Sequence, residues 1–146
     1  MRERINLYES GFSLIEPLLA GALFVMVAGA FTTALLYGEE NSKIAGQRGR
    51  ATFYAQEGIE AIRGIRNTNF SSLTDGTYGV SRSQSSGLWQ LVSGNTSIGP
   101  FTRTITISTV DSKIKDVTSV VTWQQNGQRN GQVQIQSRIS NWKTTQ

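Results

Sequence analysis

The sequence predicts an α+β fold in which one long N-terminal helix packs on a small antiparallel β-sheet. Three observations lead to this prediction. Residues 17–38 are apolar and carry no charge, apolar residues then recur at every third or fourth position up to Ile65, and after residue 70 apolar and polar residues alternate. The first two patterns are typical of helices, and the third is typical of strands buried on one face. A chain of 146 residues is long enough for one such domain with an anchor.

The first predicted element is a helix long enough to cross a lipid bilayer. Residues 17–38 would form roughly 33 Å of α-helix, which matches the thickness of the hydrocarbon core. Glu16 lies at the edge of this segment. A carboxylate at that place is costly unless a cation pairs with it, and ionisable residues within membranes are functional candidates by default. Glu16 is therefore the first candidate functional residue, and its partner must come from outside the segment.

A candidate partner is the backbone amine that cleavage after Gly11 would create. Residues 1–11 form a short polar leader, and a cut there would free the amine of Phe12, four residues before Glu16. An amine in a low-dielectric site attracts a carboxylate far more strongly than it does in water. The pair can form within one helix or between parallel, staggered helices of different copies. The second geometry would make a polymer.

The motif Gly-Phe-Ser-Leu-Ile-Glu at residues 11–16 resembles the cleavage and methylation motif of the type IV prepilin family. The resemblance implies that a prepilin peptidase cuts after Gly11 and that the new amine of Phe12 is N-methylated. It also implies that Glu16 docks each new subunit onto the base of a filament. Pro17 is a less usual residue for the family at this position. The first turn of a helix tolerates it, because an N–H there has no partner to lose.

The resemblance further implies a location, a role and a set of partners. The leader would lie in the cytoplasm, the helix would cross the cytoplasmic membrane once, and the C-terminal domain would lie outside before joining a cell-surface pilus or pseudopilus. The implied partners are the prepilin peptidase, other pilin subunits and copies of this chain, an inner-membrane assembly platform and the lipid bilayer. Residues 139–142 resemble the C-terminal strand end of minor pilins of the PilV type. The implied role is a minor pilin or pseudopilin of a pilus, competence or type II secretion-like filament.

Two other interpretations of the N-terminal region remain open. The first is a secretory signal peptide with residues 28–30, Ala-Gly-Ala, as its cleavage site, although the apolar segment continues past that site to Tyr37. The second is a single-pass anchor of a β-domain protein that does not polymerise, with Glu16 reaching the interface incidentally. The anchor explains the length of the segment but does not explain the Gly11–Phe12 junction.

The predicted helix continues beyond the membrane edge. Apolar residues at spacings of three and four form one stripe, which we expect to pack on the domain's own sheet: Ala51, Ala55, Ile59, Ile62 and Ile65. Residues 67–69 end the pattern, so a continuous helix from Phe12 would be roughly 85 Å long. The predicted parts are the leader (1–11), the apolar helix (12–38), its amphipathic continuation (39–69) and the β-sheet domain (70–146).

The second half of the chain predicts four strands, at residues 87–91, 101–107, 117–123 and 132–139. Their apolar faces are expected to lie on the helix stripe. Asn-Gly pairs at residues 126–127 and 130–131 predict a hairpin with a loop somewhat longer than two residues. Residues 71–87 and 92–99 are rich in serine, glycine and threonine and are predicted to be loops. Trp123 and Trp142 are expected to pack in the core or at the sheet edge.

Composition argues against several classes of chemistry. The chain has no cysteine and no histidine, so it has no disulfide framework, no thiolate metal site and no imidazole base. Neither a Gly-x-Ser-x-Gly elbow nor a phosphate-binding glycine loop with its lysine is present. We therefore predict that the protein is not an enzyme and that it uses no cofactor and no metal.

The net charge of +4 and the pI near 9.8 raise a second hypothesis, a DNA-binding pilin of a competence or DNA-uptake filament. Basic side chains would contact phosphates and one tryptophan would stack on bases; the candidates are Arg48, Arg50, Arg82, Arg103, Lys113, Lys115 and Trp89. Only 16% of the residues are charged, and no two lysines or arginines are adjacent. A mildly basic solvated surface explains the same charge, and we prefer that explanation.

Overall fold

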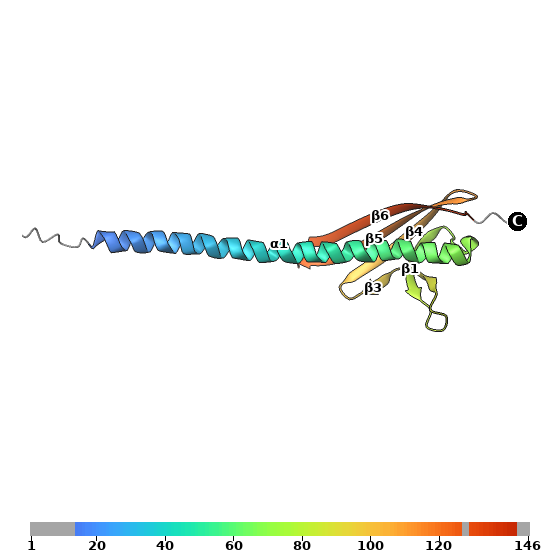
Figure 1. Ribbon diagram of the computed structural model, residues 1–146, viewed down its shortest axis with the longest axis horizontal. Coiled ribbons are helices and arrows are strands. Elements are labelled where there is room, and N and C mark those ends of the chain that lie inside the picture. Colours follow the sequence, from blue (N-terminus) through green and yellow to red (C-terminus); the bar gives the residue numbers. More distant parts are fainter. Residues whose placement is uncertain (1–13, 127–128, 143–146) are drawn as a thin grey trace, which may run out of the picture. The chain divides into compact units, whose positions relative to one another are not determined.

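The computed structural model describes residues 14–126 and 129–142, and its fold is α+β (Figure 1). Helix α1 (Ile15–Thr68) leads into a short 3-10 helix, η1 (Phe70–Ser72). Within the described residues the chain then forms six strands: β1 (Gly76–Arg82), β2 (Trp89–Ser93), β3 (Thr96–Ile98), β4 (Phe101–Asp111), β5 (Ile114–Asn126) and β6 (Arg129–Ser140). The chain divides after Ser42 into two compact units.

The first unit contains the beginning of α1. The residues of the first turn explain why the helix starts there. The first four N–H groups of a helix have no partner within it, so Pro17 in the first turn loses no hydrogen bond. Glu16 also lies in the first turn, where the positive end of the helix dipole favours a carboxylate. The predicted helix start at Phe12 lies outside the described residues.

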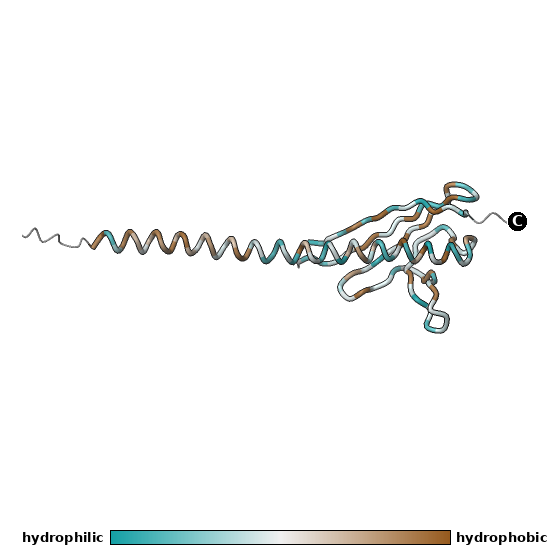
Figure 2. Tube along the Cα trace, viewed as in Figure 1, coloured by the Kyte–Doolittle hydropathy of each residue, from teal (hydrophilic) through white to brown (hydrophobic). Residues whose placement is uncertain are grey.

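The part of α1 in the first unit is mostly apolar and exposed. Every described residue of this unit is exposed, and Figure 2 colours most of this part of the helix as hydrophobic. The hydroxyls of Thr32 and Thr33 donate to the carbonyl oxygens of Ala28 and Gly29, each at 2.9 Å. Their polar groups are therefore satisfied inside the helix, which leaves an apolar outer surface.

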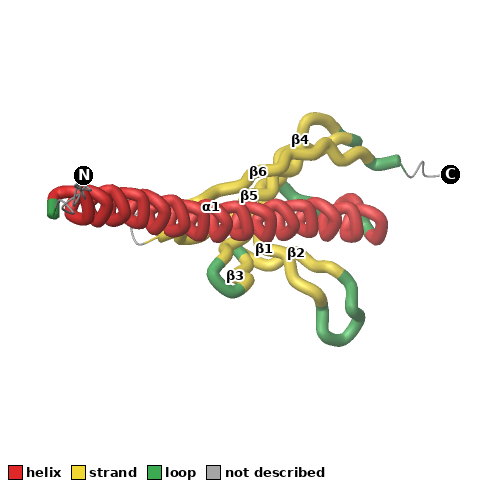
Figure 3. The backbone as a smooth tube through the Cα atoms, turned by 60° about the vertical axis from the view of Figure 1, so that its left-hand side comes forward, coloured by secondary structure: helices red, strands yellow, loops and turns green. Residues whose placement is uncertain are grey.

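The second unit is an antiparallel sheet with the last turns of α1 lying on it. The strand order is β2-β1-β4-β5-β6, and β3 pairs with β4 beside β1. In Figure 3 the two edge strands, β6 and β2, lie on opposite sides of α1, so the helix runs across the middle of the sheet. The coarse prediction of a long helix on a small antiparallel sheet is confirmed.

The predicted apolar stripe is the face of α1 that forms the core. Ile59, Ile62 and Ile65 pack with inward residues of β1, β4, β5 and β6, including Val80 and Ile105. Earlier in α1, Ala51 and Ala55 pack against three larger side chains of the sheet, those of Phe101, Val121 and Trp123. The small alanine side chains leave space for these residues. Trp123 is buried as expected, whereas Trp142 lies just beyond the edge strand β6 and is 62% exposed.

The prediction that residues 71–87 and 92–99 are loops is wrong, because β1 and β3 lie within them. Gly79 explains part of the error, since it resembles a turn glycine but lies inside β1. A Cβ at that position would come within 2.5 Å of Thr96 Oγ1. That hydroxyl of β3 accepts from the N–H of Val80 at 2.9 Å and donates to its carbonyl at 3.0 Å. Glycine here allows two strands to approach closely, which composition alone does not reveal.

The hairpin between β5 and β6 is confirmed, but the strands continue closer to the turn than predicted. Pairing extends to Asn126 opposite Arg129, so residues 127–128, which lie outside the described residues, are all that separates the strands. The second Asn-Gly pair is part of β6. Gly131 lies opposite Trp123, and a Cβ at Gly131 would collide with the indole ring. Glycine at this place therefore makes room for a core tryptophan.

Candidate functional site

The exposed apolar part of α1 is the strongest candidate for a functional surface. Its large apolar side chains are all more than half exposed, from 55% for Leu23 and Leu35 to 74% for Phe24. Monomeric soluble proteins rarely expose a contiguous apolar patch larger than a few hundred Å². A surface of this kind is typical of a segment that contacts lipid or an apolar surface of another protein.

Among the described residues, α1 is the one helix that is long and apolar enough to cross a membrane. Its apolar segment begins near the N-terminus of the chain. These are the properties that a single-pass membrane anchor needs.

Glu16 lies at the boundary of that surface. Its side chain is exposed in the first turn of α1, and it makes no hydrogen bond or ion pair with any residue in the part of the chain that the structure describes. The predicted cleavage site, Gly11 and Phe12, lies outside the described residues. Among the described residues, Glu16 is therefore a carboxylate without a partner beside an apolar helix surface.

Glycines within the apolar part of α1 are not required by contacts inside the chain. A Cβ added at Gly21 or Gly29 would meet no atom within 4 Å. Each glycine in a helix interior costs about 1 kcal/mol relative to alanine. Small residues let helix backbones approach each other closely in membranes. These two positions therefore fit contacts with other helices.

Arg103, predicted as part of a DNA-binding patch, lies in the core of the second unit instead. It is 2% exposed on the helix-facing side of β4. One of its terminal nitrogens donates to Glu57 Oε2 at 2.8 Å and to the carbonyl oxygen of Tyr54 at 3.1 Å. The other donates to the carbonyl oxygen of Val80 at 3.3 Å. Arg103 thus ties α1 to β4 and β1, and its guanidinium does not face solvent.

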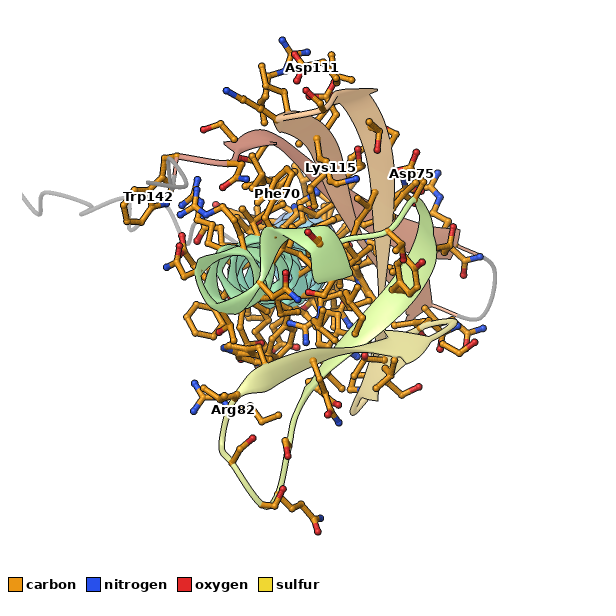
Figure 4. The ribbon with its side chains drawn as sticks, turned by 90° about the vertical axis from the view of Figure 1, so that its right-hand side faces the viewer. Phe70, Asp75, Arg82, Asp111, Lys115 and Trp142 are labelled. Atoms are coloured by element: carbon orange, nitrogen blue, oxygen red, sulfur yellow. The ribbon has the colours of Figure 1, made fainter. Side chains whose placement is uncertain are left out.

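The structure brings two other members of that predicted patch together. The Arg82 guanidinium lies 4.8 Å from the centroid of the Trp89 ring, at the ends of β1 and β2. Arg48 and Arg50 are exposed on α1, and Lys113 is exposed in the turn between β4 and β5. Figure 4 shows Arg82 and Lys115 on opposite sides of α1. The predicted residues therefore do not form one continuous basic surface.

Lys115 belongs to a polar cluster that the sequence did not reveal. Its ammonium donates to Thr109 Oγ1 at 2.7 Å and to Asp75 Oδ1 at 3.4 Å, and it lies 5.8 Å from the centroid of the Phe70 ring (Figure 4). Thr109 also donates to Asp75 at 2.6 Å. The hydrogen bond from Thr109, helped by Lys115, lowers the pKa of Asp75. The charge of Lys115 is thus compensated within the fold and is not available for a phosphate.

The chain matches no protein-family model, no curated protein and no solved structure. In the part of the chain that the structure describes, no group of three His, Cys, Asp or Glu side chains could hold a metal ion. The case for a function therefore rests on the residues themselves. The apolar surface of α1 and Glu16 at its boundary are the two features that indicate binding to a partner.

Proposed function

We propose that this protein is a structural subunit, a minor pilin or pseudopilin, of a type IV filament. A prepilin peptidase removes residues 1–11 and N-methylates Phe12, and the mature subunit leaves the membrane for the filament. The observation that carries the proposal is Glu16, the last residue of the prepilin-like motif at residues 11–16, which lies in the first turn of an exposed apolar helix and has no partner among the described residues.

The exposed apolar surface supports a subunit with two successive environments. In the membrane its large side chains face lipid, and in the filament they face the helices of other subunits. Lipid tails are as apolar as a helix bundle, so the transfer gains little free energy from apolar burial. Close packing at small residues such as Gly21 and Gly29 then contributes the attraction between helices.

Apolar packing alone does not set how far one helix slides along another. A pair between Glu16 and the amine of Phe12 on a neighbouring subunit sets that register. The α-amine has an ordinary pKa near 8, so it is cationic at neutral pH. At about 4 Å and an effective dielectric constant of 20, opposite unit charges attract by about 4 kcal/mol. The amine exists only after cleavage, so uncut chains lack the cation that completes the pair.

The orientation in this proposal is the one that the prepilin-like motif at residues 11–16 implies, with the leader in the cytoplasm. The β-sheet domain then lies outside the cytoplasmic membrane before assembly. The filament would carry it to the cell surface as part of a pilus or pseudopilus.

The test is Glu16→Gln, which removes the charge but keeps the size of the side chain. Loss of an attraction of about 4 kcal/mol lowers incorporation into filaments by roughly 1,000-fold. Membrane insertion and cleavage should continue, because the apolar segment and the Gly11–Phe12 junction are unchanged. The measurement is the amount of subunit in sheared filaments relative to the amount in the membrane.

Glu39→Gln is the matched control, since Glu39 lies just beyond the other end of the apolar segment. It removes the same charge and should leave incorporation unchanged. A second variant, Gly11→Leu, should block cleavage and leave the full-length chain in the membrane. Normal incorporation of Glu16→Gln would contradict the proposed role of the carboxylate.

A further inference from the structure

We propose that Pro17 is a positioning residue, which keeps Glu16 from pairing with the amine of its own chain and leaves it for the amine of a neighbouring copy. This inference rests on the proposed function, in which cleavage after Gly11 creates that amine at Phe12. Pro17 directly follows Glu16 and is one of two prolines in the chain.

Every cleaved chain carries both members of the pair, so the amine of the same chain competes for Glu16. Phe12 and Glu16 are four residues apart in the sequence. Residues four apart lie on the same face of an α-helix, one turn from each other. A long side chain on a helix also points back towards the N-terminus, over the preceding turn. In a helix that included Phe12, the carboxylate of Glu16 would therefore lie close to the amine of its own chain.

Pro17 opposes a helix that begins at Phe12. In such a helix the nitrogen of residue 17 would have to donate a hydrogen bond to the carbonyl oxygen of Ser13, four residues earlier. Proline has no N–H to donate, and its ring clashes with that carbonyl group. The first turn of a helix tolerates proline, because the N–H groups there have no partner within the helix. Pro17 therefore favours a helix that begins after Ser13.

The start of α1 agrees with this limit. α1 begins at Ile15, and Leu14 before it is a turn residue. The first hydrogen bond of such a helix runs from the N–H of residue 18 to the carbonyl oxygen of residue 14, so it does not involve Pro17. α1 thus begins at the earliest residue that Pro17 allows. Phe12 and Ser13 lie outside the described residues, and their place is inferred from Pro17 alone.

This helix start weakens the internal pair. An amine that lies before the start of α1 is not held over Glu16 by the helix backbone. An internal pair would then have to order the residues between the amine and Glu16, which costs conformational entropy. Among the described residues Glu16 has no hydrogen bond or ion pair. Pro17 therefore leaves this carboxylate for an amine from another copy.

Pro17→Ala tests the inference, because alanine restores the N–H and is the residue that favours helices most. The cleaved, N-methylated chain is purified from membranes into detergent micelles, diluted with unlabelled chains so that only contacts within one chain are seen, and studied by NMR. In the unaltered chain, helical chemical shifts should begin near Ile15, without a contact between the N-methyl protons of Phe12 and the side chain of Glu16. In Pro17→Ala the helical shifts should extend to residues 13–14, and that contact should appear.

The same variant should lower incorporation into filaments roughly tenfold, because a subunit whose Glu16 is paired internally must first break that pair. Cleavage and the amount of subunit in the membrane should stay unchanged. Pro17→Gly restores the N–H in a residue that disfavours helices, so its loss of incorporation should be smaller than that of Pro17→Ala. The control is Pro100→Ala, which exchanges the other proline, in the turn between β3 and β4, and should change neither the NMR contact nor incorporation.

The outcomes separate a failure of this inference from a failure of the proposed function. A contact between Phe12 and Glu16 within the unaltered chain would overturn the role of Pro17, and so would equal incorporation of Pro17→Ala and the unaltered chain. A chain that is never cleaved has no amine at Phe12 and would overturn both. Cleaved chains that form filaments, together with a Pro17→Ala variant that lacks the internal contact, would overturn this inference alone.

Discussion

Both parts of α1 contain many apolar residues, but these residues are exposed in the first part and form a buried stripe in the second. Up to Ser42 every described residue is exposed, although many are large and apolar. From Ala51 to Ile65 one stripe of small and branched apolar residues is buried under the sheet. The second part packs on the sheet of its own chain, whereas the first part has no such partner among residues 14–126 and 129–142. Apolar composition therefore predicts that a helix surface is buried against something. The fold shows which part of α1 is buried within its own chain.

Glycine makes the same contrast visible at single positions. A Cβ at Gly58 would lie 2.7 Å from Ser119 Oγ and 2.9 Å from Ile105 Cδ1, so this glycine is required by the helix–sheet contact. A Cβ at Gly29 would meet nothing within 4 Å. Gly58 in the second part is thus required by the fold, whereas Gly29 in the first part is not required by any contact among the described residues.

The largest expected effect on stability comes from exchanging these two glycines for valine. Gly58→Val should lower the free energy of unfolding of the β-sheet domain by about 3 kcal/mol, because the added carbons overpack the core. Gly29→Val should leave that free energy unchanged within about 0.5 kcal/mol, since no atom lies nearby. Chemical unfolding of the full chain in mild detergent, followed by tryptophan fluorescence, measures both. Equal losses of the free energy of unfolding in the two variants would contradict the difference between the two parts of α1.

A smaller loss is expected when the buried ion pair in the second part is broken. Glu57→Ala leaves the guanidinium of Arg103 buried without its carboxylate and should cost about 2 kcal/mol. The cost is below that of a fully buried pair because the Glu57 side chain is 36% exposed. Arg103→Met removes the cation and fills its space, so it should cost less than Glu57→Ala.

The double variant, Glu57→Ala with Arg103→Met, separates the pair from its parts. It should be no less stable than Glu57→Ala alone, because neither charge is then stranded. The same unfolding experiment measures all three variants. A double variant whose losses simply add would show that Arg103 and Glu57 do not interact in the folded chain.

A modest loss of stability is expected in acid. Hydrogen bonds from Thr109 lower the pKa of Asp75, and the Arg138 guanidinium lowers the pKa of Asp116. Each folded-state pKa thus lies below the unfolded-state value of about 3.9, so the stabilisation is complete above that pH. It is lost as the pH falls from about 4 through the folded-state values. Melting temperatures between pH 5 and pH 2 should fall less steeply for the double variant Asp75→Asn, Asp116→Asn than for the unaltered chain.

The smallest expected effect concerns DNA. Arg103 is buried and Lys115 is engaged with Thr109 and Asp75. The other four predicted basic residues are exposed but are spread over α1, the end of β1 and the turn between β4 and β5. The full chain should bind duplex DNA weakly, and the affinity should change little between low and moderate salt. Fluorescence anisotropy with a labelled duplex measures this. A steep salt dependence that disappears with Arg48→Gln and Arg50→Gln would instead support the DNA-uptake hypothesis.

The main elements of the fold could be predicted from periodicity. The stripe from Ala51 to Ile65 and the strands that contain Phe101, Val121 and Ile139 have regular patterns, and each is found where it was expected. β1 escaped prediction because Gly76 and Gly79 resemble turn residues, and Gly79 is explained only by its contact with β3. Local patterns do not reveal close approaches between segments.

Burial of Arg103 could have been read from the sequence, since it lies at the same alternate positions as Phe101 and Ile105. Because Arg103 is charged, we instead predicted that it lies on the surface. The cluster of Asp75, Thr109 and Lys115 had no such signal, because its members are brought together only by the folded sheet. Glu16 was predicted from sequence as a functional residue, and the structure adds that no described residue neutralises it.

The central claim is that a new backbone amine at Phe12 neutralises Glu16 of a neighbouring subunit. Intact-mass and N-terminal fragment analysis of the protein extracted from its native membranes and filaments tests this most directly. The account predicts a chain that begins at Phe12 and carries a methyl group on its amine. A filament subunit that still begins at Met1, or one that begins beyond Ala30, would contradict it.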